Sequence, residues 1–216
     1  MKHLKSILVI AIISFVAISC SDNNDTVIEP TSTPKQIKNF YAPQKTNYTV
    51  SPPVTSGEFI KFSFKEGKAV TGDNWDIAFR GTRILVNGGT TIGGITEESV
   101  RTKNASIALV SNTFDKVETV PSDSEFKQDA SGSYALPWGS NKGWYTYLGL
   151  PSHKIEPIAG KVIVVKTIDG NYAKMEIKSY YKDMDSSNSA DPKNSGSQYY
   201  TFDYVYNSKV GDKSLK

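Results

Sequence analysis

The sequence has a single cysteine, Cys20, among its 216 residues. One thiol excludes an intrachain disulfide, so packing must stabilise the fold, and a content of 38% apolar residues is compatible with that. Histidine is almost as scarce, because only His3 and His153 occur. Clusters of histidine and cysteine at metal-binding spacing are therefore lacking, and a zinc site is not expected.

The chain also lacks the charge and the motifs of several function classes. Its formal net charge of +3 is too small for the basic surplus that meets a phosphate backbone, so nucleic acid is not an expected partner. No Gly-x-Ser-x-Gly elbow is present, and His153 is the one histidine outside the N-terminal segment that could act as a base. We therefore expect a protein that is not an enzyme.

The N-terminal segment predicts export and lipidation. Lys2 and Lys5 precede an apolar run over 7–18, which is typical of a signal peptide covering 1–19. The residues before Cys20, Val-Ala-Ile-Ser, resemble a bacterial lipobox, so Cys20 is the expected lipidation site. The alternative is an ordinary secretory signal followed by a free thiol, which would be unpaired in an oxidising compartment.

The residues that follow Cys20 predict a flexible tether over 20–45. They are polar and contain proline, and such a stretch buries too little apolar area to fold. Acidic residues directly after the cysteine resemble the signal that sends lipoproteins to the outer face of the outer membrane. We expect a protein anchored in the outer membrane by lipid and exposed at the cell surface.

The remainder, 46–216, predicts an all-β fold: a single compact antiparallel β domain. Apolar residues recur with period two, and no window longer than about ten residues has a convincing helical period. Asp169-Gly170 between two strand-like runs indicates a hairpin, because glycine accepts the positive φ of a tight turn. The predicted strands are 59–64, 75–80, 83–86, 106–110, 144–148, 161–167, 172–181 and 198–206.

Alternation within these strands predicts which side chains are buried. Trp75, Ile77 and Phe79 are expected on one core face, with Asp76 and Arg80 on the opposite face. In the strand 172–181, the face with Met175 is expected to be buried and the face with Lys174 to be solvated. In 198–206 the expected buried face consists of Tyr200, Phe202, Tyr204 and Tyr206.

Three segments together resemble the HmuY family of surface lipoproteins. They are Asn-Trp-Asp-Ile-Ala-Phe-Arg-Gly-Thr with Val-Asn-Gly-Gly over 74–89, Gly-Trp-Tyr-Thr-Tyr over 143–147, and the strand pair around 164–175. The similarity extends over roughly 59–206. It implies an all-β, haemophore-like protein that takes haem from host haemoproteins and passes it to a TonB-dependent receptor.

The haem ligands that the resemblance implies do not carry over. The best-known family members hold the iron with two histidines, but one of these positions falls near Gly149 and the other in an insertion shortened here to 122–142, which has no histidine. Three interpretations of His153 remain: an axial ligand from a shifted loop, paired with a methionine or tyrosine; a structural loop histidine; or a residue beside a pocket whose ligand contains no iron.

Other side chains complete the candidate site. Met184, in a polar loop, is the candidate second ligand, whereas Met175 is expected in the core. Tyr134 and Trp138 either line a flat apolar pocket or cap the sheet. A further set of acidic residues either gathers a calcium ion or is simply solvated: Asp183, Asp185 and Asp191.

The leading hypothesis is a lipoprotein that binds haem or a related porphyrin, with His153 and Met184 coordinating iron if iron is bound. The alternative is a structural or interaction lipoprotein of the same family that has lost haem ligation, which the missing histidines favour.

Overall fold

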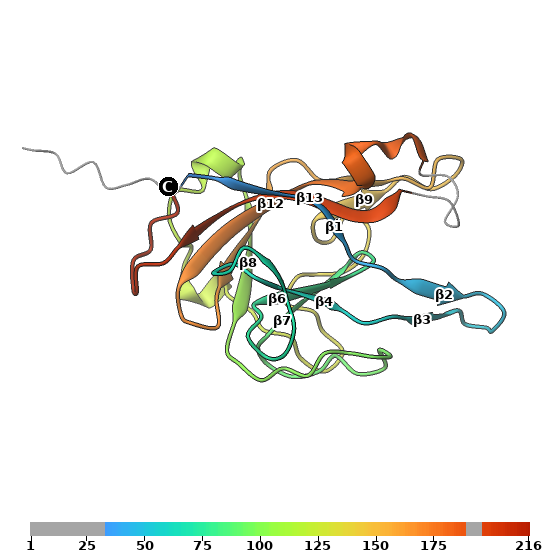
Figure 1. Cartoon of the computed structure of the whole chain (residues 1–216), viewed down its shortest axis with the longest axis horizontal. Coiled ribbons are helices and arrows are strands. Elements are labelled where there is room, and N and C mark those ends of the chain that lie inside the picture. The colour runs from blue at the N-terminus through green and yellow to red at the C-terminus, as the bar shows by residue number, and fades with distance from the viewer. Residues whose placement is uncertain (1–32, 189–195) are drawn as a thin grey trace, which may run out of the picture. The chain divides into compact units, whose positions relative to one another are not determined.

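The computed structural model describes residues 33–188 and 196–216. The expected signal peptide and Cys20 lie outside these residues. Within them, the strands form two antiparallel sheets and two short ribbons (Figure 1). The all-β fold class is therefore confirmed. In the described ranges, no helix has the length and apolar character that crossing a membrane requires.

The larger sheet has five strands in the order β1-β13-β12-β11-β8. The predicted hairpin is its centre, with Val165 of β11 paired to Ala173 of β12. The long last strand also forms as predicted, between β1 and β12. The bounds are β1 Lys35–Tyr41, β8 Ser106–Ser111, β11 Lys161–Lys166, β12 Tyr172–Tyr181 and β13 Ser197–Asn207.

The smaller sheet has four strands in the order β5-β4-β6-β7. Its strands are β4 Ile60–Ser63, β5 Lys68–Val70, β6 Ile77–Arg80 and β7 Arg83–Val86. The ribbons pair β2 Lys45–Asn47 with β3 Val54–Ser56, and β9 Tyr145–Tyr147 with β10 Ile155–Pro157. Short 3-10 turns complete the described elements: η1 Phe114–Lys116, η2 Asp123–Glu125, η3 Lys182–Met184 and η4 Ser186–Asn188. Figure 1 shows the β2–β3 ribbon extending away from the sheets.

Strand β1 lies inside the segment that was predicted to be a flexible tether. Its Ile37 pairs with Phe202 of β13, and both Ile37 and Phe40 pack against the main core. The tether prediction is therefore wrong for residues 35–41. A polar sequence without regular apolar alternation can still add a strand to a sheet when a long neighbouring strand has an unpaired edge.

Aromatic side chains pack the two sheets face to face. Phe62 and Phe79 of the smaller sheet contact Phe202 of β13, with ring centroids 5.3 and 5.9 Å apart. Such pairs contribute about 0.5–1.5 kcal/mol each beyond the area they bury. Tyr200 and Tyr204 are buried beside them. The predicted buried face of the last strand is thus confirmed for Tyr200, Phe202 and Tyr204, whereas Tyr206 is only partly buried.

The outer face of the larger sheet is covered as well. Ile163 and Val165 of β11 belong to the core between the sheets, whereas Val162 and Val164 pack with Phe114 of η1. The sequence of a strand that is buried on both faces is a continuous hydrophobic run rather than an alternation of apolar and polar residues.

This covering reverses the prediction for Lys174, which was expected in solvent. Lys174 is buried, and its Nζ donates hydrogen bonds to the carbonyl oxygens of Phe114 and Val117, at 2.8 and 3.0 Å. The ammonium group also lies 4.4 Å from the centre of the Phe114 ring. Burial lowers the pKa of Lys174. Alternation along β12 could not reveal that a segment 60 residues away covers this face.

The side chains predicted in the core around β6 are buried, but the prediction that they share one face is wrong for Trp75. Trp75, Ile77 and Phe79 are all fully buried. Trp75, however, packs with Ala78 and Leu85 in a separate cluster on the other side of the sheet. The strand begins only at Ile77, so period-two alternation does not extend back to Trp75.

Asp76 and Arg80, expected opposite the core face, are buried too. The Asp76 carboxylate accepts hydrogen bonds from the backbone N–H groups of Phe64, at 2.8 Å, and Ile168, at 2.9 Å. Because Ile168 follows β11 and Phe64 follows β4, this one side chain joins the two sheets. Arg80 donates to the carbonyl oxygen of Gly57 at 2.8 Å.

The buried position of Asp76 predicts an unusual pH dependence. Burial raises the pKa of the Asp76 carboxyl, against the opposing effect of its backbone hydrogen bonds. A folded-state pKa above the unfolded one means that this group's contribution to stability is fully present below the unfolded pKa and decreases as pH rises through the folded pKa. The difference in unfolding free energy between wild type and Asp76→Asn should therefore be smaller at about pH 7 than at about pH 4.

Urea unfolding of both proteins across this pH range would measure the difference. Asp73→Asn is a matched control, because Asp73 is an exposed carboxyl close to Asp76 in the chain. A wild-type advantage over Asp76→Asn that grows with pH would contradict the prediction.

Candidate ligand-binding site

His153 lies in the turn that joins β9 to β10. The ribbon is closed by hydrogen bonds from Leu148 N–H to the carbonyl oxygen of Lys154, at 2.9 Å, and from His153 N–H to that of Gly149, at 2.7 Å. Both Gly149 and His153 have left-handed backbones, with φ of 68° and 51°. Glycine adopts this region without strain, whereas histidine needs such local hydrogen bonds to hold it there.

The imidazole of His153 contacts the hydroxyl of Tyr147. Nδ1 and Oη form a hydrogen bond, and the two ring centroids are 6.0 Å apart. His153 is half-buried, and Tyr147 is 43% exposed. Among the described residues, Nε2 of His153 has no hydrogen-bond partner. The histidine that the sequence singled out is therefore one half of a tyrosine–histidine pair.

Met184 lies at the same end of the domain as His153. Ile155 N–H donates to the hydroxyl of Tyr181, at 2.8 Å, which places the start of β10 against the end of β12. Lys154 Nζ reaches Ser186 Oγ at 3.3 Å, across the segment that contains Met184. Met184 itself is 52% exposed. Its segment and the His153 turn thus lie side by side, a necessary condition for one flat ligand to meet both.

The segment with Met184 is tied to strand β1. Asn39 and Asp183 exchange two hydrogen bonds of 2.7 Å, one through the backbone N–H of Asp183 and one through its carboxylate. The polar sequence around Met184 is therefore ordered by side-chain contacts rather than by apolar burial. Of the proposed calcium ligands, Asp191 lies outside the described residues. Within residues 33–188 and 196–216, no three acidic, histidine or cysteine side chains are placed to hold a metal ion together.

Tyr134 and Trp138 are brought together by Arg83. The guanidinium group lies 4.1 Å from the centre of the Trp138 ring and donates from Nε to the Tyr134 hydroxyl at 3.1 Å. Tyr134 packs against the cluster around Trp75, so it caps the sheet. Burial raises the pKa of the Tyr134 hydroxyl, although the nearby Arg83 opposes this shift. Trp138 is 41% exposed and is the member of the pair open to a ligand.

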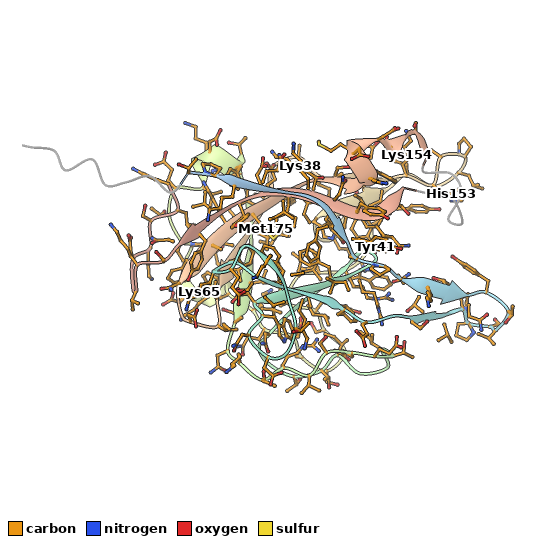
Figure 2. All side chains as sticks on the ribbon, in the orientation of Figure 1. Lys38, Tyr41, Lys65, His153, Lys154 and Met175 are labelled. Carbon is orange, nitrogen blue, oxygen red and sulfur yellow. The ribbon has the colours of Figure 1, made fainter. Side chains whose placement is uncertain are left out.

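Contacts along one segment connect Trp138 to the His153 turn. Two residues after Trp138, Ser140 Oγ accepts the backbone N–H of Tyr147 at 2.9 Å. Thr146 also donates its hydroxyl to the side-chain oxygen of Asn141, at 2.7 Å. The segment that carries Trp138 therefore contacts the β9–β10 ribbon that carries His153. Met175 is buried within the larger sheet, as predicted, and lies away from His153 (Figure 2).

Sequence reasoning missed the exposed side chains between these candidates. Tyr147, Leu148 and Leu150 are solvent-accessible in the described structure, and Leu150 is 81% exposed. The signal that could have revealed them is a run of apolar residues extending past the end of a strand into a Gly-Leu-Pro turn. A turn rich in exposed apolar groups is a mark of a binding surface.

A cavity of about 600 Å³ lies against β4 and β5, away from the His153 turn. Its lining includes Phe59, Lys61 and Val70 and none of the four residues proposed from the sequence.

Comparisons with known proteins place these observations in context. The family model of the HmuY protein matches residues 55–204. No curated protein matches the chain. Matching solved structures include a candidate lipoprotein of Bacteroides fragilis, with 14% identity and a TM-score of 0.42 over 84% of this chain and 94% of that one.

Two other solved structures match over similar lengths. An apo HmuY analog of Tannerella forsythia has 18% identity and a TM-score of 0.40, over 82% of this chain and 95% of that one. A candidate HmuY-like heme-binding protein of Bacteroides vulgatus has 13% identity and a TM-score of 0.46, over 84% of this chain and 96% of that one.

Proposed function

Because this chain belongs to the HmuY family, we propose that it binds haem or a related porphyrin at the end of the domain that carries His153. The observation that supports this most directly is that the His153 turn and the Met184 segment lie side by side. Trp138, whose ring is 41% exposed, lies two residues before Ser140, which contacts Tyr147 of β9.

The donor chemistry of this end fits a porphyrin iron. Iron in a porphyrin takes imidazole, thioether or phenolate as axial ligands. His153, Met184 and Tyr147 provide one of each type. The exposed side chains of Leu148 and Leu150 offer apolar contact to a flat ring, as in small-molecule sites lined mainly by apolar groups.

The proposed biological role is haem uptake at the cell surface. The lipobox-like residues before Cys20 support a lipid anchor, and a matching structure from Bacteroides fragilis is described as a candidate lipoprotein. In this role the protein would sit on the outer membrane, accept haem from host haemoproteins and deliver it to a TonB-dependent receptor. It would act by binding and not as an enzyme.

The second candidate function is a structural or interaction lipoprotein without haem ligation. The absence of the family's two ligand histidines from the sequence favours it. It differs from the first in a single measurable property, the binding of a porphyrin.

A titration of the mature protein with haemin, followed by visible absorption, tests the proposal. We expect a shifted Soret band that saturates at one porphyrin per chain, and His153→Ala should weaken binding roughly tenfold or more, because removal of a ligand or its hydrogen-bond partner typically costs 10–100-fold. Val210→Ala is the control, since Val210 is 88% exposed and follows the far end of β13. If wild type leaves the Soret band unshifted in both iron oxidation states, the first function is rejected and the second candidate function is the one supported.

A further inference from the structure

Tyr147 Oη and His153 Nδ1 form a hydrogen bond in which the donor depends on the tautomer of the imidazole. A phenol is the stronger donor of the two groups, and an imidazole nitrogen is the stronger acceptor. The neutral pair is therefore best arranged with the phenol proton directed at Nδ1 and the imidazole proton on Nε2. In that tautomer Nε2 carries the proton, and Nδ1 is free to accept the proton of the Tyr147 hydroxyl.

The same arrangement favours the oxygen of Tyr147. We propose that Tyr147 Oη is the axial ligand of the porphyrin iron and that His153 is its proton acceptor. This inference rests on the haem or porphyrin binding proposed above, and it assigns the ligating atom of that site. Tyrosine is an established axial ligand of haem iron in proteins, as a phenolate.

The position of Tyr147 suits this role better than that of His153. Tyr147 is 43% exposed, whereas His153 is half-buried. The backbone of Tyr147 is held on both sides, by pairing with Ile155 of β10 and by the hydrogen bond of its N–H to Ser140 Oγ. Its hydroxyl is therefore presented from a strand whose backbone is fixed.

Ligation of iron by Tyr147 requires no reactant other than the porphyrin and the protein. The phenol proton moves from Oη to Nδ1 of His153, and the phenolate oxygen forms a bond to iron in place of a water molecule, which leaves. No electron is transferred, and the phenolate and the imidazolium remain paired. Because phenolate is a hard, anionic oxygen ligand, it stabilises ferric over ferrous iron, so the site should hold oxidised haem more tightly than reduced haem.

The experiment compares wild type with Tyr147→Phe, which removes only the hydroxyl. Tyr48→Phe is the matched control, because Tyr48 is an exposed tyrosine beyond the end of β2. Each protein is titrated with haemin and, separately, with metal-free protoporphyrin. Resonance Raman spectra excited in the phenolate-to-iron charge-transfer band report the ligand directly.

We expect Tyr147→Phe to lose the phenolate bands and at least tenfold in haemin affinity, with protoporphyrin affinity unchanged and Tyr48→Phe like wild type. His153→Ala should keep the phenolate bands while binding haemin more weakly. Ring nitrogen shifts of His153 in the ligand-free protein should report a proton on Nε2.

Two results overturn the assignment, and they are distinguishable. If wild type binds haemin and Tyr147→Phe retains its spectrum and affinity, Tyr147 is not the ligand, although the proposed function stands. If wild type binds neither haemin nor protoporphyrin, the proposed function fails together with the ligand assignment.

Discussion

Replacing Asp129 with alanine is expected to lower the free energy of unfolding by about 4 kcal/mol, since removing one partner of a buried ion pair typically costs about 3–5 kcal/mol. The Asp129 carboxylate is fully buried and accepts the backbone N–H groups of Val86, at 3.0 Å, and Ala135, at 2.8 Å. It also pairs with Arg101, whose Nη2 lies 2.8 Å away and whose side chain is 1% exposed. Asp129→Ala would leave two backbone N–H groups without an acceptor. The buried guanidinium of Arg101 would also lose one of its two carboxylate partners.

Glu98 is the other partner of Arg101, at 2.7 Å from Nη1. It limits the loss, because the guanidinium group keeps one carboxylate after Asp129 is removed. Asp129→Asn should cost less than Asp129→Ala, since the amide oxygen can still accept one of the backbone hydrogen bonds.

Chemical denaturation of the two variants and of Asp123→Ala would test this prediction. Asp123 is the matched control, because its carboxylate is 75% exposed and pairs with Lys213 only at the surface, at 3.4 Å. Exposed pairs contribute at most about 1 kcal/mol. Similar losses for Asp129→Ala and Asp123→Ala would show that the buried network contributes little.

Replacing Gly89 with alanine is expected to destabilise the fold by about 4 kcal/mol, through two separable causes. Gly89 has a φ of 80°, and a left-handed backbone costs a residue with a Cβ about 1–2 kcal/mol. A Cβ at this position would also lie 2.0 Å from the carbonyl oxygen of Asp129. That oxygen accepts the N–H of Thr90 at 2.8 Å and is part of the backbone, so relieving the overlap must displace the chain, at a cost of about 1–3 kcal/mol.

Gly94 separates the two causes within the same loop. Its φ of 68° is similar, but no atom lies within 4 Å of the position a Cβ would occupy. Gly94→Ala should therefore cost only about 1–2 kcal/mol, from the backbone conformation alone. Thermal or denaturant unfolding of both variants would measure the difference, and equal losses at the two positions would mean that the approach of Gly89 to Asp129 is not a constraint.

Much of the fold was accessible from local pattern. The hairpin of β11 and β12, the long strand β13 and the burial of Ile77 and Phe79 follow from alternation and from the Asp-Gly turn. These features depend on residues close together in the chain, where side-chain direction has a fixed period. Strand β1 was missed because its pairing depends on the edge of β13, which lies about 160 residues later.

The candidate site could be foreseen only in part. His153 and Met184 stood out from composition, because histidine and methionine are rare in this chain. Tyr147 did not, because it is one of 12 tyrosines, and nothing in its neighbourhood in the sequence distinguishes it from the buried Tyr145. The direction of its hydroxyl toward Nδ1 of His153 is a property of the folded turn.

The amino-acid order alone was sufficient for the all-β class, the family and the chemical types of the candidate ligands, because these depend on short-range periodicity and on which residues are present. The tertiary structure decided the rest. Contacts between distant segments bury Lys174 under η1, join the two sheets through Asp76, and bring the Met184 segment beside the His153 turn. These contacts depend on which distant segment packs on each face of a strand. The alternation of residues along one strand does not contain that information.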